Sequence, residues 1–169
     1  MSKAFTREDD DRPERPARLR RASALPPGTQ NLMTAAGVLR LRQTLERLVG
    51  ERATMAPPAS EMDGQSQLQS LDERILQLQQ SLETAVVPAR STPDGVVAFG
   101  CTVCVRERDG QQPSYRIVGV DEVDLDRGWI SWQSPLARAL EGARAGQRIR
   151  FPSPAGVQEL QVLSVERDD

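Results

Sequence analysis

The sequence contains no histidine at all, and this absence removes several classes of catalytic chemistry. Without an imidazole the chain cannot form a Ser-His-Asp triad, use a histidine general base or build a zinc site that needs a histidine ligand. It also has no phosphate-binding glycine loop and no nucleophile elbow. We therefore expect a protein that is not an enzyme in its own right, has no cofactor or metal, and takes no small-molecule substrate.

Aromatic residues make up only 4% of the chain, and the charge is nearly balanced, with 22 Lys and Arg against 24 Asp and Glu. The low aromatic content excludes a row of aromatic side chains on which the bases of a single-stranded nucleic acid could stack. The balanced charge excludes the basic excess that is typical of a protein that binds nucleic acid directly. No apolar run approaches the roughly 20 residues of a membrane span. Residues 1–21 are charged and lack the apolar core of a secretory signal. We expect a cytoplasmic protein with no membrane partner.

Two cysteines, Cys101 and Cys104, form a lone CxxC motif. Such a pair can be a redox site or half of a zinc site. Residues 97–105 are typical of a β-strand, however, in which residues three apart point to opposite faces of the sheet. No second cysteine pair exists to complete a zinc shell. We therefore interpret both cysteines as ordinary strand residues.

The first 31 residues alternate blocks of charge with prolines and hold few large apolar side chains. Little burial is available there to offset the entropy that is lost on ordering. We predict a disordered charged tail over residues 1–31.

Residues 32–87 carry two helical patterns separated by a loop. Thr34 is the candidate N-cap of the first helix, and Gly50 is its candidate end. Apolar residues recur at spacings of three and four in both patterns: Val38, Leu41, Leu45 and Leu48, then Leu68, Leu71, Ile75, Leu78 and Leu82. Because the loop over residues 53–65 contains Pro57-Pro58 and Gly64, we expect an antiparallel helical hairpin. A dimerisation hairpin or half of a small bundle would show the same pattern.

After a linker over residues 88–95, the pattern changes to short β-rich runs separated by turns. The runs lie at residues 96–107, 114–120, 129–132, 147–151 and 157–165. Ser134 as N-cap, with Pro135 in the first helical position, predicts a short helix that ends at residue 140. Residues 96–169 are therefore predicted to form a small antiparallel sheet domain with one short helix, and the whole chain is of the α+β class.

Several short sequence motifs in the C-terminal part occur in the order and spacing of a known family. They are YRIVGVDE at residues 115–122, ISWQSPLARAL at 130–140, Gly146, and PAGV at 154–157. Because of these motifs, residues 96–166 resemble the Gre family of bacterial transcription elongation factors. The motif SKAFTRE at residues 2–8 is similar to the N-terminus of GreB-type members.

The resemblance implies an FKBP-like sheet fold without isomerase activity. In the family this domain docks on bacterial RNA polymerase at the rim of the secondary channel, and the hairpin enters that channel. The positions that match the polymerase-facing surface are Asp121, Glu122, Ser134 and Pro135. Any contact with nucleic acid would come through the polymerase complex.

The tip of the hairpin departs from the family. Gre factors carry there an acidic motif resembling Gly-Asp-x-x-x-Glu-Asn, whose carboxylates help to hold a magnesium ion in the polymerase active centre. The nearest acids in this chain are the candidate tip acids Glu61 and Asp63, in a loop where solvated turn residues are the commoner interpretation. Aligned by its flanking leucines, the arm also lacks about two turns from each helix, which shortens it by about 10 Å.

We therefore predict a Gre-family protein that binds RNA polymerase and modulates transcription with little or no stimulation of transcript cleavage. Two alternatives stay open. The first is a true cleavage-stimulating factor in which Glu61 and Asp63 replace the usual acids. The second is an interaction protein whose hairpin dimerises or binds a partner other than the polymerase.

Overall fold

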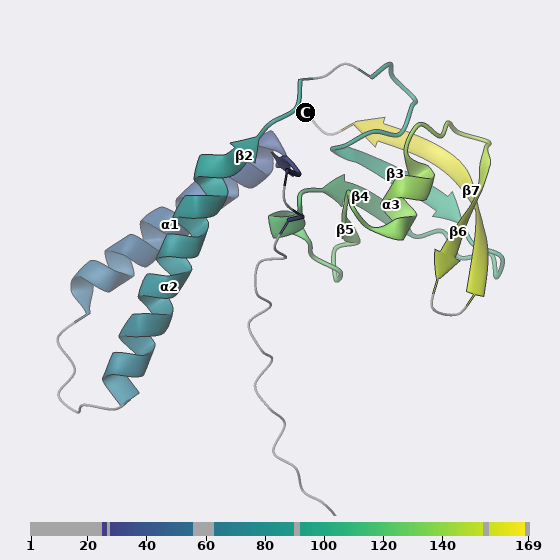
Figure 1. The fold of residues 1–169 in the computed structure, drawn as a ribbon. Coiled ribbons are helices and arrows are strands. Elements are labelled where there is room, and N and C mark those ends of the chain that lie inside the picture. The colour runs from purple at the N-terminus through teal and green to yellow at the C-terminus, as the bar shows by residue number, and fades with distance from the viewer. Residues whose placement is uncertain (1–24, 27, 56–62, 90–91, 154–155, 168–169) are drawn as a thin grey trace, which may run out of the picture.

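The computed structural model describes residues 25–26, 28–55, 63–89, 92–153 and 156–167. A long helical hairpin stands beside a small sheet, and the two meet at the base of the hairpin (Figure 1). The elements, in chain order, are β1 (Asn31–Leu32), α1 (Ala35–Thr54), α2 (Asp63–Thr84), β2 (Ala85–Val86), β3 (Cys101–Arg106), β4 (Ser114–Val118), the 3₁₀ turn η1 (Val120–Glu122), β5 (Trp129–Ser131), α3 (Pro135–Leu140), β6 (Arg148–Ser153) and β7 (Gly156–Arg167). The predicted α+β class is confirmed. Of the tail predicted over residues 1–31, residues 1–24 and 27 lie outside the described residues, and Asn31 already belongs to β1.

Helix α1 begins where the sequence predicts. Thr34 caps it, because the Thr34 hydroxyl accepts a hydrogen bond from the Gly37 amide at 2.9 Å. The helix continues through Gly50, where the sequence predicts its end, and runs to Thr54. A glycine inside a helix costs about 1 kcal/mol. The packing of α1 on α2, with Leu48 buried, offsets that cost, so the predicted end at Gly50 is wrong.

Helix α2 carries the predicted apolar seam. Leu78 is buried, and the other seam residues are half-buried: Leu68, Leu71, Ile75 and Leu82. Near the tip, Arg52 Nε of α1 donates a hydrogen bond to Asp72 Oδ1 of α2 at 2.7 Å. At the base, β1 and β2 pair in parallel and tie the two ends of the hairpin together. The antiparallel hairpin is therefore closed at its base and packed along its length.

The five-stranded sheet has the strand order β5-β4-β3-β7-β6. Strand β3 is antiparallel to β4 and to β7, and β7 is antiparallel to β6, as predicted. The fourth pair, β4 with β5, is parallel. The chain makes this possible because residues 119–128 turn through η1 and return to start β5 in the direction of β4. The sheet, together with η1 and α3, is called the sheet domain below.

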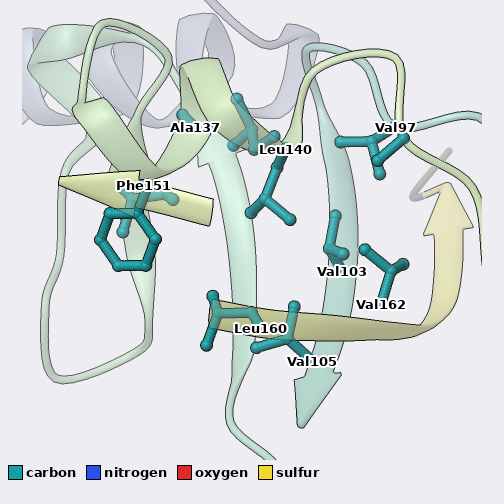
Figure 2. Close-up of a cluster of buried hydrophobic side chains, with 11 residues drawn as sticks. Val97, Val103, Val105, Ala137, Leu140, Phe151, Leu160 and Val162 are labelled. Carbon is teal, nitrogen blue, oxygen red and sulfur yellow. The ribbon is translucent and has the colours of Figure 1, made fainter. Parts of the chain in front are cut away.

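The core of the sheet domain lies between α3 and one face of the sheet (Figure 2). Its fully or nearly fully buried members come from distant segments: Val97, Val103, Val105, Ala137, Leu140, Phe151, Leu160 and Val162. Each buried valine or leucine contributes about 1.5–3 kcal/mol relative to an exposed one. Cys101 is buried and Cys104 is half-buried, and both are free thiols on alternate faces of β3, which confirms their interpretation as strand residues.

Candidate functional site

The family resemblance implies that residues 121–122 and 134–135 contact a partner. Both segments follow the carboxyl ends of two neighbouring strands, β4 and β5. Strands β4 and β5 run parallel, with Val118 opposite Ser131. Just beyond, the Trp132 amide donates a hydrogen bond to the Val118 carbonyl at 2.9 Å. Parallel strands have their carboxyl ends at one edge of the sheet, so residues 119–122 and 132–135 emerge at a common edge. The parallel pair, which was not predicted from the sequence, creates this edge.

Ser134 and Pro135 form the start of α3. The Ser134 hydroxyl accepts a hydrogen bond from the Ala137 amide at 3.1 Å, and Pro135 stands in the first turn, where its missing N–H has no helical partner to lose. Ser134 is half-buried and Pro135 is exposed. The pair is therefore a helix cap that also presents a proline ring at the surface.

Asp121 lies half-buried in η1 and is bonded to the hairpin. Its Oδ2 accepts a hydrogen bond from the hydroxyl of Ser81, in the last turn of α2. The Ser81 carbonyl in turn accepts a hydrogen bond from Asn31 Nδ2 at 3.1 Å. Asp121 is therefore partly accessible and at the same time attached to the base of the hairpin.

Glu122 differs from the other three predicted contacts, because its side chain is only 1% exposed. One carboxylate oxygen accepts hydrogen bonds from the amides of Thr34 at 2.8 Å and Gly119 at 3.1 Å. The other accepts from the Thr34 hydroxyl at 2.5 Å and from Arg40 Nη2 at 3.2 Å. A carboxylate offers about four lone-pair sites, and all four are used. The sequence prediction needs correction here: the η1 turn directs Glu122 against the start of α1, so it acts inside the protein.

Two glycines make room for this carboxylate. A Cβ atom on Gly37 would lie 2.0 Å from Glu122 Oε1. A Cβ atom on Gly119 would lie 2.3 Å from the Leu32 carbonyl oxygen and 2.9 Å from Glu122 Oε2. Neither glycine was singled out from the sequence. A glycine in the first turn of a predicted helix, which costs about 1 kcal/mol, was the available signal of a packing requirement.

Arg40 reaches from α1 to the sheet domain. Its guanidinium lies 4.4 Å from the ring centroid of Trp129 while it also bonds to Glu122. Arg116 and Arg127 each lie 5.3 Å from the same centroid. A cation–π contact at a partly exposed site is worth about 0.5–1 kcal/mol. The Trp129 ring is therefore a second attachment point for α1.

The contacts of the candidate tip acids are not described. Glu61 lies outside the described residues. Asp63 is the first residue of α2, but the structure describes only its backbone. Within the part of the chain that the structure describes, no group of three or more acidic or cysteine side chains could hold a metal ion. Any role of the two acids stays a prediction from the sequence.

A cavity of about 290 Å³ opens where the base of the hairpin, residues 87–89 and the sheet domain meet. It is lined in part by Phe99, Arg116 and Arg167, and by none of the four predicted contacts. Arg167 Nη2 already donates hydrogen bonds to the carbonyls of Thr92 at 2.7 Å and Pro93 at 3.3 Å. We assign the candidate site to the edge beyond β4 and β5 and not to this cavity.

Comparison with known proteins decides the family. Residues 92–167 match the family model described as "Transcription elongation factor, GreA/GreB, C-term". Transcription elongation factor GreB of Neisseria meningitidis serogroup A is 34% identical over 154 residues, which cover 82% of this chain and 94% of that protein. The chain belongs to the GreA/GreB family. The resemblance read from the residues is thereby confirmed, and the protein is a Gre-family transcription elongation factor.

Relatives of this Gre factor occur in both named branches of the family. GreB of Pseudomonas aeruginosa is 35% identical over 158 residues, covering 83% of this chain and 94% of the relative. GreA of Alkalilimnicola ehrlichii is 32% identical over 150 residues, which cover 79% of this chain and 95% of the relative. Among the helices described for this Gre factor, none combines the length and the apolar character that crossing a membrane requires.

Proposed function

We propose that this Gre factor binds bacterial RNA polymerase through the edge that carries Asp121, Ser134 and Pro135, and that its hairpin enters the secondary channel. It stimulates little or no transcript cleavage. The polymerase supplies the catalytic centre, so the factor is not itself an enzyme, and it meets nucleic acid only through the polymerase complex. The proposal rests on the family and on the arrangement of this edge.

The observation that carries the weak-cleavage part is the hairpin itself. Its helices have 20 and 22 residues, and α1 ends at Thr54 while α2 begins at Asp63. A helix of 20 residues is about 30 Å long. Gre factors that the chain resembles have arms about two turns longer, a difference of about 10 Å. A carboxylate must come within about 2 Å of magnesium to coordinate it, so a tip that falls 10 Å short on the same docking pose cannot do so.

The composition of the tip points in the same direction. Residues 55–63, which join α1 to the start of α2, lack the Gly-Asp-x-x-x-Glu-Asn pattern and offer only Glu61 and Asp63 as acids. Magnesium in such centres takes one or two protein carboxylates and otherwise keeps water and substrate oxygens. A pair of acids at the wrong distance therefore supplies no ligand to the ion.

A transcript-cleavage assay on a backtracked elongation complex tests this proposal. It is run beside a binding measurement with the same polymerase and the same preparation of the factor. We expect binding without cleavage, and concentration-dependent inhibition of an authentic cleavage factor, because both compete for one rim. Failure to bind the polymerase at all would refute the proposal, and a stable dimer in light scattering would then favour a separate interaction protein.

The alternative of an active cleavage factor is tested in the same assay. It predicts measurable cleavage that disappears in the double variant Glu61→Ala, Asp63→Ala while polymerase binding stays unchanged. Glu73→Ala is the matched control, because Glu73 is an exposed acid inside α2 and outside the segment that joins the two helices. Cleavage by the wild-type factor and the Glu73 variant, lost only in the double variant, would establish this alternative.

A further inference from the structure

Both helices of the hairpin are attached to two consecutive acids of the sheet domain. Glu122 binds the start of α1 through Thr34 and Arg40, and Asp121 binds the end of α2 through the Ser81 hydroxyl. We call these five residues the joint. Because each helix has its own attachment point, rotation of the hairpin about either helix axis breaks at least one of these bonds.

All hydrogen-bonding positions of the Glu122 carboxylate are occupied by donors of the protein. Each of its two oxygens accepts two hydrogen bonds, from four separate donors at 2.5–3.2 Å. Hydrogen bonds weaken steeply when they are bent, so four of them fix the position and the plane of the group. The negative charge also lies at the N-terminal end of α1, where the helix dipole favours it.

The Thr34 hydroxyl connects this carboxylate to the helix. It accepts a hydrogen bond from the Gly37 amide at 2.9 Å and donates a hydrogen bond to Glu122 Oε1. The N-cap of α1 is therefore completed by a side chain of the sheet domain. Gly37 lies so close that a Cβ atom there would be 2.0 Å from Glu122 Oε1, which leaves the helix no room to rotate toward the carboxylate.

We call the edge that carries Asp121, Ser134 and Pro135 the docking edge. We propose that the joint fixes the direction of the hairpin relative to this docking edge, with Glu122 and Arg40 as positioning residues. Asp121 belongs to the joint and to the proposed docking edge, and Ser134 and Pro135 emerge at the same edge. Docking therefore sets the direction in which the hairpin points. The consequence for transcription rests on the proposed function, whereas the fixed direction is a property of the protein alone.

The length of the hairpin makes this direction important. A helix of the length of α1, 20 residues, extends about 30 Å from the joint. A tilt of about 10° at the base displaces the far end of such a helix by about 5 Å. A factor that has to enter a channel therefore needs a base with little angular freedom.

The direction of the hairpin can be measured without polymerase. Spin labels are placed on the full chain at Glu46→Cys of α1 and Arg138→Cys of α3, both exposed sites, after Cys101 and Cys104 have been replaced by alanine. The interspin distance is then recorded by pulsed electron paramagnetic resonance. We expect one narrow distance distribution for the protein with an intact joint.

Two variants loosen the joint to different degrees. Arg40→Ala removes one bond to Glu122 and the contact with Trp129, and Glu122→Ala removes all four bonds. We expect each variant to widen the distance distribution at least twofold. Arg42→Ala, an exposed arginine of the same helix, is the matched control and should leave the width unchanged. Arg40 has a side chain that is 39% exposed, so its variant remains folded and informative even if Glu122→Ala does not fold. A narrow distribution in Arg40→Ala would overturn the proposal.

A second experiment connects the joint to the polymerase. A photo-crosslinking residue at Val49, which is 46% exposed near the end of α1, reports whether the hairpin enters the channel. We expect Arg40→Ala to bind polymerase within about twofold of the wild type but to crosslink at least fivefold less. An equal loss of binding and crosslinking would contradict a positioning role. If the wild-type factor does not bind polymerase, the proposed function fails, while the spin-label distances still decide the joint.

Discussion

Replacing Gly37 with alanine would place a methyl group where the Glu122 carboxylate lies. The new Cβ would stand 2.0 Å from Oε1, 2.2 Å from Cδ and 2.9 Å from Cγ of Glu122. The carboxylate cannot swing aside freely, because its side chain is only 1% exposed and four donors hold it. Either the start of α1 moves away from η1, or Glu122 gives up its hydrogen bonds.

The size of the effect follows from opposing terms. Alanine is favoured over glycine inside a helix by about 1 kcal/mol. Against this, a net hydrogen bond to a charged group is worth about 1.5–3 kcal/mol, and overpacking a tight site costs about 1–3 kcal/mol. Losing part of the carboxylate's contacts therefore outweighs the helical gain, and we expect a net loss of about 3 kcal/mol. For a chain of this size each kcal/mol lowers the melting temperature by about 2–4 °C, so the shift is about 6–12 °C.

Gly50→Ala is the matched control, because it is the same substitution in the same helix. A Cβ atom at Gly50 meets nothing within 4 Å. It should therefore raise stability by about 0.5–1 kcal/mol through helix propensity alone. Urea unfolding followed by far-UV circular dichroism compares the two variants with the wild type. If Gly37→Ala proves as stable as Gly50→Ala, the close packing of Glu122 on α1 is refuted.

Three further predictions concern other parts of the molecule. Pro135→Ala should weaken polymerase binding about tenfold, equivalent to about 1.4 kcal/mol, in a binding titration, and a matching loss of melting temperature would instead mark a purely structural role. Leu78→Ala, at a site 5% exposed, should cost about 2–4 kcal/mol in urea unfolding, against less than about 0.5 kcal/mol for Leu76→Ala at 54% exposure. The hydrogen bond from Arg150 lowers the pKa of Glu159 below 4.5, so the stabilisation from Glu159 is present above that pH and is lost as the pH falls through the lowered pKa. An NMR titration should show the Glu159 midpoint rising in Arg150→Ala, and an unchanged midpoint would contradict this cause.

The features that the sequence predicted correctly depend on neighbouring residues. The caps at Thr34 and Ser134 are local, since each side chain bonds an amide three residues later. The seam that contains Leu78 is also local, because spacings of three and four place residues on one helix face. Periodicity and cap chemistry are thus sufficient to locate the two long helices and α3, although they misplace the end of α1, which runs through Gly50 to Thr54.

The features that were missed depend on contacts across the chain. The parallel pairing of β4 and β5 contradicts the usual expectation that a connection as short as residues 119–128 joins antiparallel strands. Glu122 looks like a surface acid in the sequence, yet its partner Thr34 is 88 residues away. No local sequence pattern indicates such a distant hydrogen-bond donor. The sequence therefore predicted the positions of the candidate site but not the contacts that join the hairpin to the sheet domain.

The completion of the α1 cap by Glu122 has a consequence for how the protein unfolds. The amide of Thr34 and the hydroxyl that holds the Gly37 amide both depend on a carboxylate that the sheet domain supplies. The base of the hairpin and the sheet domain are therefore expected to open as one cooperative unit, with amide hydrogens that exchange slowly with solvent. Residues 53–55, at the other end of α1, are exposed, and the side-chain hydrogen bond that links this end to α2, from Arg52 to Asp72, lies at the surface, so their amides should exchange faster. Slow exchange should thus mark the end of the hairpin that is anchored beside the docking edge, and faster exchange the last turn of α1.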